Sequence, residues 1–236
     1  MRGELDLRPG PGGSAVVLLE PDPGRLGLAR LQGPVEVLAS SAAAWVVVEG
    51  GRGAMEVAGE RAELEGGRQD VFEAPGWPAL AGPGSVVRLE GPSLGAVVAW
   101  RRWDRPLQPR LLAPGQVAEE QRGSGPARRL VRTYLATGPL MAGETINEPG
   151  GWSSFPPHRH EHEEVYLYRF SPPHGFGASL VYEGPGGPVD AAMVRDGSVP
   201  EDRVRLPPGS GRPREPDALP VGPGRGVADP VGQPGP

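Results

Sequence analysis

Apolar and polar residues alternate in short runs along the first hundred residues. Runs of valine, leucine and alanine with a period of two are separated by turns rich in glycine and proline. A period of two is typical of a strand that buries one face. Strands are predicted at residues 14–19, 44–48, 54–58, 86–89 and 96–100. Short strands at regular spacing with such turns predict a β-sandwich or barrel.

The alternation stops at residues 104–118, where prolines interrupt the chain, and then resumes. This stretch is predicted to be a connector. Beyond it, strands are predicted at residues 127–134, 140–146, 164–170 and 178–182. A chain of 236 residues holds one large β domain or two small ones and is long enough to bury a core. The expected organisation is a first domain at 1–103, the connector at 104–118, a second domain at 119–197 and a tail at 198–236.

Three of the four histidines lie in one short run that leads into the strand at 164–170. First-row divalent metals bind imidazole nitrogen and carboxylate oxygen, and alternate residues of a strand point the same way. His158 and His160 can therefore reach one ion from one face. Parity extended back along the strand puts Glu164 on that face and Glu163 on the other. The predicted metal ligands are His158, His160 and Glu164.

His162 has the same parity as these ligands, but it lies where a hairpin turn is expected between the ligand strands. We interpret it as a solvated turn residue, dispensable for metal binding. A charged surface loop is the alternative for the whole cluster. The His-x-His spacing followed by a glutamate on a strand favours the metal site.

This spacing resembles the metal motif of the cupin superfamily. The surrounding residues resemble the bacterial 5-deoxy-glucuronate isomerases of inositol catabolism, weakly in the first half of residues 1–197 and specifically in the second. The matching segments are Gly150 to His160, Arg122 to Gly125 with Arg129, Glu164 to Phe170, Gly175 to Gly177 and Val194 to Gly197.

The resemblance implies an all-β bicupin of two double-stranded β-helix (jelly-roll) barrels, the second incomplete at its C-terminal edge. Residues 1–115 contain no histidine, so the first barrel is expected to lack metal ligands. The implied activity is that of an aldose-ketose isomerase, which converts 5-deoxy-glucuronate to 5-dehydro-2-deoxy-gluconate. Its substrate is a small sugar acid, and its cofactor is one divalent ion. Imidazole and carboxylate ligands leave zinc, manganese, iron and nickel open.

Isomerisation needs a general base to move a proton, and the sequence does not identify it. Glu163, Tyr166, Tyr168 and Arg169 lie nearby, although both tyrosines are equally well explained as barrel-lining residues. Arg129, Tyr166, Tyr168 and Arg169 are the candidate substrate-binding residues. Arg129 or Arg169 could hold the substrate carboxylate through a bidentate fork.

Two other functions remain open at this point. A metal-dependent cupin oxygenase would use iron and dioxygen, and oxygen consumption would identify it. A non-catalytic sugar-binding cupin would bind its ligand and form no product.

The tail at 198–236 departs from the family pattern. It lacks aromatic residues and alternation, is rich in glycine and proline, and has a composition that cannot bury enough apolar area to order itself. The family's fourth metal ligand, a histidine on a late strand, is missing. If the gene is read one nucleotide later from a point between Ser198 and Arg205, the genetic code permits the C-terminal residues that are typical of the family. The missing histidine then stands at position 207. The tail is thus interpreted as frameshifted or disordered, and activity of the chain as written is doubtful.

Composition excludes several partners. The net charge of −5 gives no basic surface for nucleic acid, and without cysteine there is neither a disulfide framework nor thiol chemistry. The N-terminus lacks a signal-peptide pattern, and no apolar run approaches the ~18 residues of a membrane span. A cytoplasmic protein without membrane partners is expected, and the oligomeric state is left open.

Overall fold

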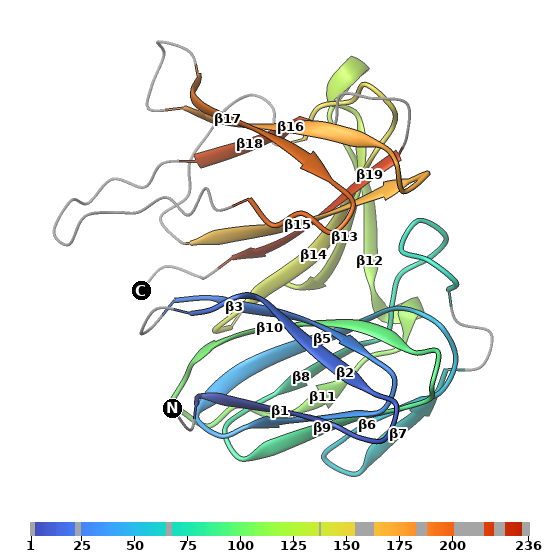
Figure 1. Ribbon diagram of the computed structural model, residues 1–236, viewed down its shortest axis with the longest axis vertical. Helices are drawn as coiled ribbons and strands as arrows, with labels where there is room; N and C mark the ends of the chain where they lie inside the picture. The colour runs from blue at the N-terminus through green and yellow to red at the C-terminus, as the bar shows by residue number, and fades with distance from the viewer. Residues whose placement is uncertain are drawn as a thin grey trace, which may run out of the picture. The chain divides into compact units, whose positions relative to one another are not determined.

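Antiparallel β-strands make up nearly all of the regular structure (Figure 1). The computed structural model describes residues 3–21, 25–64, 68–136, 138–153, 163–182, 188–200, 215–219 and 225–232. Backbone contacts divide the chain into two units, Met1–Val117 and Ala118–Pro236. Over the described ranges, no helix is long and apolar enough to span a membrane.

The first unit consists of two antiparallel sheets. The five-stranded sheet has the order β1-β4-β9-β6-β7, and the six-stranded sheet has the order β11-β8-β5-β10-β3-β2. Their strands are β1 (Leu5–Pro9), β2 (Ser14–Leu19), β3 (Gly27–Gln32), β4 (Val35–Ala39), β5 (Ala42–Gly50), β6 (Ala54–Val57), β7 (Glu60–Glu63), β8 (Pro78–Ala81), β9 (Ser85–Glu90), β10 (Gly95–Arg102) and β11 (Arg110–Leu111), followed by the 3-10 helix η1 (Pro114–Gln116).

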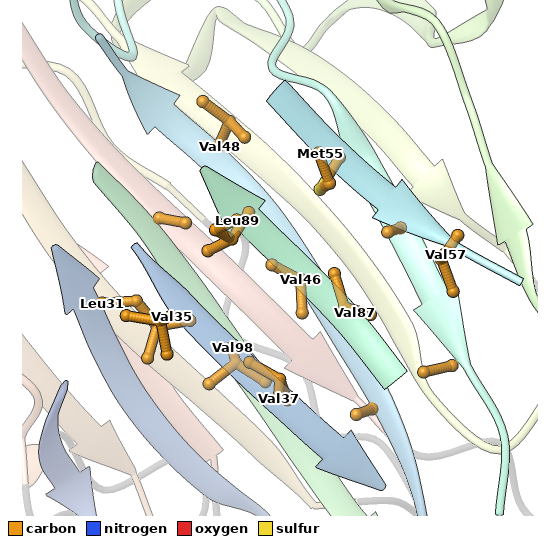
Figure 2. Packing of buried hydrophobic residues seen from close by; sticks show 14 of the residues in the cluster. Leu31, Val35, Val37, Val46, Val48, Met55, Val57, Val87, Leu89 and Val98 are labelled. Atoms are coloured by element: carbon orange, nitrogen blue, oxygen red, sulfur yellow. The ribbon is translucent and has the colours of Figure 1, made fainter. Parts of the chain in front are cut away.

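The core of the first unit lies between these sheets. In β4, buried Val35, Val37 and Ala39 alternate with half-buried residues, which is the expected pattern of a strand with one inward face. Figure 2 shows aliphatic side chains from several strands gathered in this core, including Met55 and Leu89. Burial of this apolar surface holds the two sheets together.

The second unit also has two antiparallel sheets. One has the order β12-β13-β14-β19-β15 and the other β17-β16-β18 (Figure 1). Its elements are β12 (Ala118–Arg122), the 3-10 helix η2 (Gly125–Ala127), β13 (Arg129–Leu135), β14 (Met141–Asn147), β15 (Glu164–Ser171), β16 (Phe176–Tyr182), β17 (Pro188–Arg195), β18 (Glu215–Leu219) and β19 (Arg225–Gly232).

The predicted all-β class is confirmed, and the strands expected from alternation coincide with β2, β5, β6, β9, β10, β13, β14, β15 and β16 to within a few residues. The stretch at 104–118 contributes β11, which pairs with β8, and η1. The short strands β3 and β4 were not predicted individually.

The tail differs from its sequence pattern. No strand is predicted after Gly197, yet the structure contains β18 and β19 in this region. β19 pairs with both β14 and β15, and β18 pairs with β16. Backbone pairing needs no alternation of side chains, so the apolar pattern gives no sign of these strands.

Candidate functional site

The two units differ in the residues that occupy their inward-facing strand positions. In the central strands of the first unit these positions are apolar. They are Ala29 and Leu31 in β3, Ala42, Ala44, Val46 and Val48 in β5, and Ala96, Val98 and Trp100 in β10 (Figure 2 shows several of them). A packed aliphatic interior offers no hydrogen-bonding groups to a polar ligand. A site for a polar ligand is therefore expected in the second unit.

One face of β15 lines the interior of the second unit. Tyr166, Tyr168 and Phe170 are buried and form a cluster with Val194 of β17, which belongs to the other sheet. The rings of Tyr166 and Tyr168 lie 6.1 Å apart between centroids, at an interplanar angle of 36°. Alternation places half-buried Glu164, the first residue of β15, on this same inward face.

The pairing between strands shows which residues of the neighbouring strands lie on this inward face. Phe170 of β15 lies opposite Gly226 of β19, Gly226 lies opposite Asn147 of β14, and Asn147 lies opposite Arg129 of β13. Directly paired residues share a face, so Asn147 and Arg129 face the interior with the tyrosines. Thr145 reaches the same face through its own pairing, opposite Ala228. Polar groups thus line this interior from three strands.

Arg129 is held by the turn that precedes its strand. Its Nη1 donates a hydrogen bond to the carbonyl oxygen of Ala127 at 3.0 Å. Gly123 has φ +72°, and a Cβ there would lie 2.2 Å from that carbonyl oxygen, so only glycine fits. Burial lowers the pKa of the Arg129 guanidinium from its ordinary value, repulsion from Arg122 lowers it further, and Tyr166 acts in the opposite direction.

A tight turn after β14 leads toward the histidine run. The Gly151 N–H donates to the carbonyl oxygen of Glu148 at 2.9 Å, and the Trp152 N–H donates to that of Pro126 in η2 at 2.8 Å. Gly150 has φ +73°, in the left-handed region that favours glycine. These bonds fix the direction in which the chain leaves Asn147.

Two of the three predicted metal ligands, His158 and His160, lie outside the described residues, as does His162. Glu164 is described and has the inward parity that the sequence predicts, while Glu163 has the opposite parity. Within the described ranges, no three His, Cys, Asp or Glu side chains come together as a metal-binding group. The ligand set stays a prediction.

Arg169 lies on the opposite face of β15 from the tyrosines. Its Nε donates to Oδ1 of Asp196 at 3.0 Å, and the same oxygen accepts the Phe170 N–H at 2.8 Å. The Gly197 N–H donates to the carbonyl oxygen of Tyr168 at 2.7 Å, so the turn after β17 runs along this edge of β15. Of the two candidate arginines, the structure brings Arg129 and not Arg169 to the inward face.

Sequence reasoning missed several inward polar residues, above all Asn147, Thr145 and Ser179 of β16. The strand predicted at 140–146 stops one residue before Asn147. Parity alone could have grouped Thr145 with Asn147, but only the pairing with β19 and β15 shows which face of β14 is inward. The tail strand that provides this link was not predicted.

Two units, each built of two antiparallel sheets, define the architecture of a double cupin. The chain is structurally similar to an IolB-like protein from Salmonella typhimurium LT2, with a TM-score of 0.76 and 19% sequence identity over 93% of this chain and 92% of that one. A cupin 2 conserved barrel domain protein from Leptotrichia buccalis is similar with a TM-score of 0.52 and 12% identity, over 94% of this chain and 89% of that one. These similarities show the cupin fold.

The sequence model of the KduI/IolB family matches residues 32–208, and the chain belongs to this family. The 5-deoxy-glucuronate isomerase of Geobacillus kaustophilus is 30% identical over 155 residues, which cover 59% of this chain and 56% of that protein. The protein of the same name from Listeria monocytogenes is 28% identical over 134 residues, covering 50% and 49%. The chain spans about half the length of the curated relatives it matches.

Proposed function

We propose that the second unit carries the active site of an aldose-ketose isomerase that converts 5-deoxy-glucuronate to 5-dehydro-2-deoxy-gluconate. The observation that carries the proposal is the inward face of β15, which presents Glu164, Tyr166 and Tyr168 beside Arg129 and Asn147. The printed activity of the curated relatives supports the choice of reaction and substrate.

A divalent metal ion is part of this proposal, with His158, His160 and Glu164 as its ligands. The inward parity of Glu164 fits this role, and two imidazoles with a carboxylate form a donor set suited to a first-row ion. When bound, the ion supplies Lewis-acid stabilisation of the negative charge that develops on the substrate's carbonyl oxygen. The identity of the ion stays open among zinc, manganese, iron and nickel.

The chain's own residues would bind the substrate and move its proton. The Arg129 guanidinium faces inward and can pair with the substrate carboxylate as a planar fork. A base takes the proton from C2 and returns it to C1, while the hydroxyl proton on O2 is transferred to O1, so that the C1 aldehyde becomes a hydroxymethyl group and C2 becomes a ketone. Of the candidates for the base, Tyr166 and Tyr168 lie on the inward face, while Glu163 and Arg169 have the opposite parity.

The test follows the reaction in heavy water by NMR. The protein with its tail read in the restored frame is incubated with 5-deoxy-glucuronate, with and without a chelator, and aldehyde loss and deuterium uptake at the reacting carbons are recorded. We expect turnover that the chelator abolishes, with at least partial deuterium incorporation through an enediolate. Absence of turnover with every supplied divalent metal would refute the isomerase.

Two carboxylate variants test in this assay whether Glu164 is a metal ligand. Glu164→Gln removes the proposed ligand, and Glu63→Gln removes an exposed carboxylate of β7 in the first unit, whose partner is Arg61. We expect Glu164→Gln to lose both bound metal and turnover, and Glu63→Gln to keep both. Equal metal content in the two variants would remove Glu164 from the ligand set.

A further inference from the structure

Asn147 and Ser179, inside the second unit, each have a buried polar side-chain atom without a partner in the described part of the chain. Among the described residues, Oδ1 of Asn147 in β14 and Oγ of Ser179 in β16 have no hydrogen-bond partner. Asn147 is 2% exposed and Ser179 is 0% exposed. Buried polar atoms are nearly always hydrogen-bonded, because an unmet one destabilises the fold. Two such atoms in one unit call for a partner that the described chain does not supply.

Both residues lie on inward faces, one on each sheet. Asn147 shares a row with Phe170, which belongs to the tyrosine cluster. On the other sheet, Gly177 pairs with Val194 of that cluster, and Ser179 stands two residues further along β16 on the same face. The two unmet atoms therefore face one interior from opposite sides.

The chemistry of these groups indicates what would satisfy them. The Asn147 amide can both donate and accept, and so can the Ser179 hydroxyl. Alcohol hydroxyls, which also donate and accept, complement both groups. Arg129, in the same row as Asn147, adds a fixed positive charge suited to a carboxylate. An apolar ligand would leave the Asn147 and Ser179 atoms unmet.

We propose that Asn147 and Ser179 are hydroxyl-binding residues, which hold the hydroxyl groups of an open-chain sugar acid whose carboxylate pairs with Arg129. This inference rests on the proposed function and extends it, because it assigns the recognition of the substrate's hydroxyl groups to two residues on opposite sheets. A site built to bond a hydroxyl discriminates strongly against an analogue that lacks it.

The proposal predicts opposite effects on stability and binding. An apolar replacement of similar size removes an unmet buried atom, so the variant is at least as stable as the parent. The same replacement removes a bond to the ligand, so affinity falls. A purely structural polar group, for example one that bonds a buried water, predicts the reverse, namely lower stability with unchanged affinity.

The experiment uses the full chain with Asn147→Leu and Ser179→Ala. Ser93→Ala is the matched control, because the Ser93 Oγ in the first unit accepts a hydrogen bond from the Arg52 N–H at 3.3 Å. Melting temperature is measured by calorimetry, D-glucuronate binding by titration calorimetry, and KM with 5-deoxy-glucuronate. We expect both variants to melt at or above the parent temperature and to weaken binding about tenfold, or 1.4 kcal/mol. The control should melt slightly lower and bind normally.

The outcomes separate this inference from the isomerase. Turnover by the parent with unchanged KM and binding in both variants would overturn the hydroxyl-binding role alone. Weakened binding in the variants of a parent that binds D-glucuronate but forms no product would uphold the role and refute the isomerase. A parent that neither binds nor reacts with the tail in either reading frame would overturn both.

Discussion

Breaking the buried ion pair between β13 and β14 is expected to destabilise the second unit. Arg132 Nη1 lies 3.0 Å from Oε2 of Glu144, and these side chains are 3% and 0% exposed. Arg132 Nε also contacts Glu119 Oε2 at 2.9 Å, but the Glu119 side chain is 40% exposed. Arg132 and Glu144 are paired directly across the two strands that carry Arg129 and Asn147. The pair therefore helps to hold the register on which the site depends.

The magnitude follows from burial. Glu144→Leu would remove the buried counter-charge and leave the Arg132 guanidinium with the half-exposed carboxylate of Glu119, which destabilises by about 3–5 kcal/mol. With roughly 2–4 °C per kcal/mol, the melting temperature should fall by roughly 6–20 °C. Glu119→Ala removes a half-exposed partner and should lower stability by less than about 1 kcal/mol. The double variant Arg132→Met/Glu144→Leu replaces both charges by apolar groups and should recover most or all of the loss.

Urea unfolding followed by tryptophan fluorescence measures the stabilities of the parent and of these variants. The single variant Arg132→Met completes the double-mutant cycle that isolates the pairwise energy. Amide hydrogen exchange in β13 and β14 shows whether the loss is local. A fall of less than about 1 kcal/mol in Glu144→Leu, or a double variant no more stable than this single one, would refute the reasoning.

Further predictions concern the metal, the substrate carboxylate and the tail. Single alanine variants at His158 and at His160 should lose bound metal while His162→Ala retains it, as metal analysis would show, and the opposite pattern would overturn the ligand assignment. Arg129→Gln should raise KM at least about tenfold, because it removes the charged fork that binds the substrate carboxylate. The kcat and the melting temperature should change little, since the substitution also relieves the cost of burying the charge. An unchanged KM would show that Arg129 does not bind the carboxylate. Reading the gene one nucleotide later from codons 198–205 should raise the melting temperature and metal content, and no change would show that the frame of the tail does not matter to the fold.

The fold could be predicted because period-two alternation survives in nearly every long strand. Val46, Val48 and Val98 face the first core as their parity requires. Short strands such as β4 carry too few residues for alternation to identify them individually. Which strands pair with one another could be expected only from the family resemblance, since the local pattern does not specify pairing between distant segments.

The candidate site could be predicted only in part. The inward parity of Glu164, Tyr166 and Tyr168 follows from one strand's own alternation, and the structure agrees with it. Asn147 and Ser179 could not be found in this way, because their inward orientation depends on pairing between strands far apart in sequence. Arg169 could not be placed from its charge and location in sequence, because its strand parity turns it to the face opposite the tyrosines, where its Nε donates to Asp196.

The sequence of β19 is poorly suited to a central strand of a sheet, and this mismatch bears on the reading frame of the tail. It lies between β14 and β15, yet it contains Pro230, and proline cannot donate a backbone hydrogen bond in a central strand. Its ladder with β14 pairs residues 141–142 and 145–147 and omits Gly143 and Glu144, the positions that face Pro230 and Asp229. Natural sequences rarely combine an inner strand with residues so poorly suited to it. We therefore propose that the tail is read in a shifted frame, and the nucleotide sequence of the gene decides this directly.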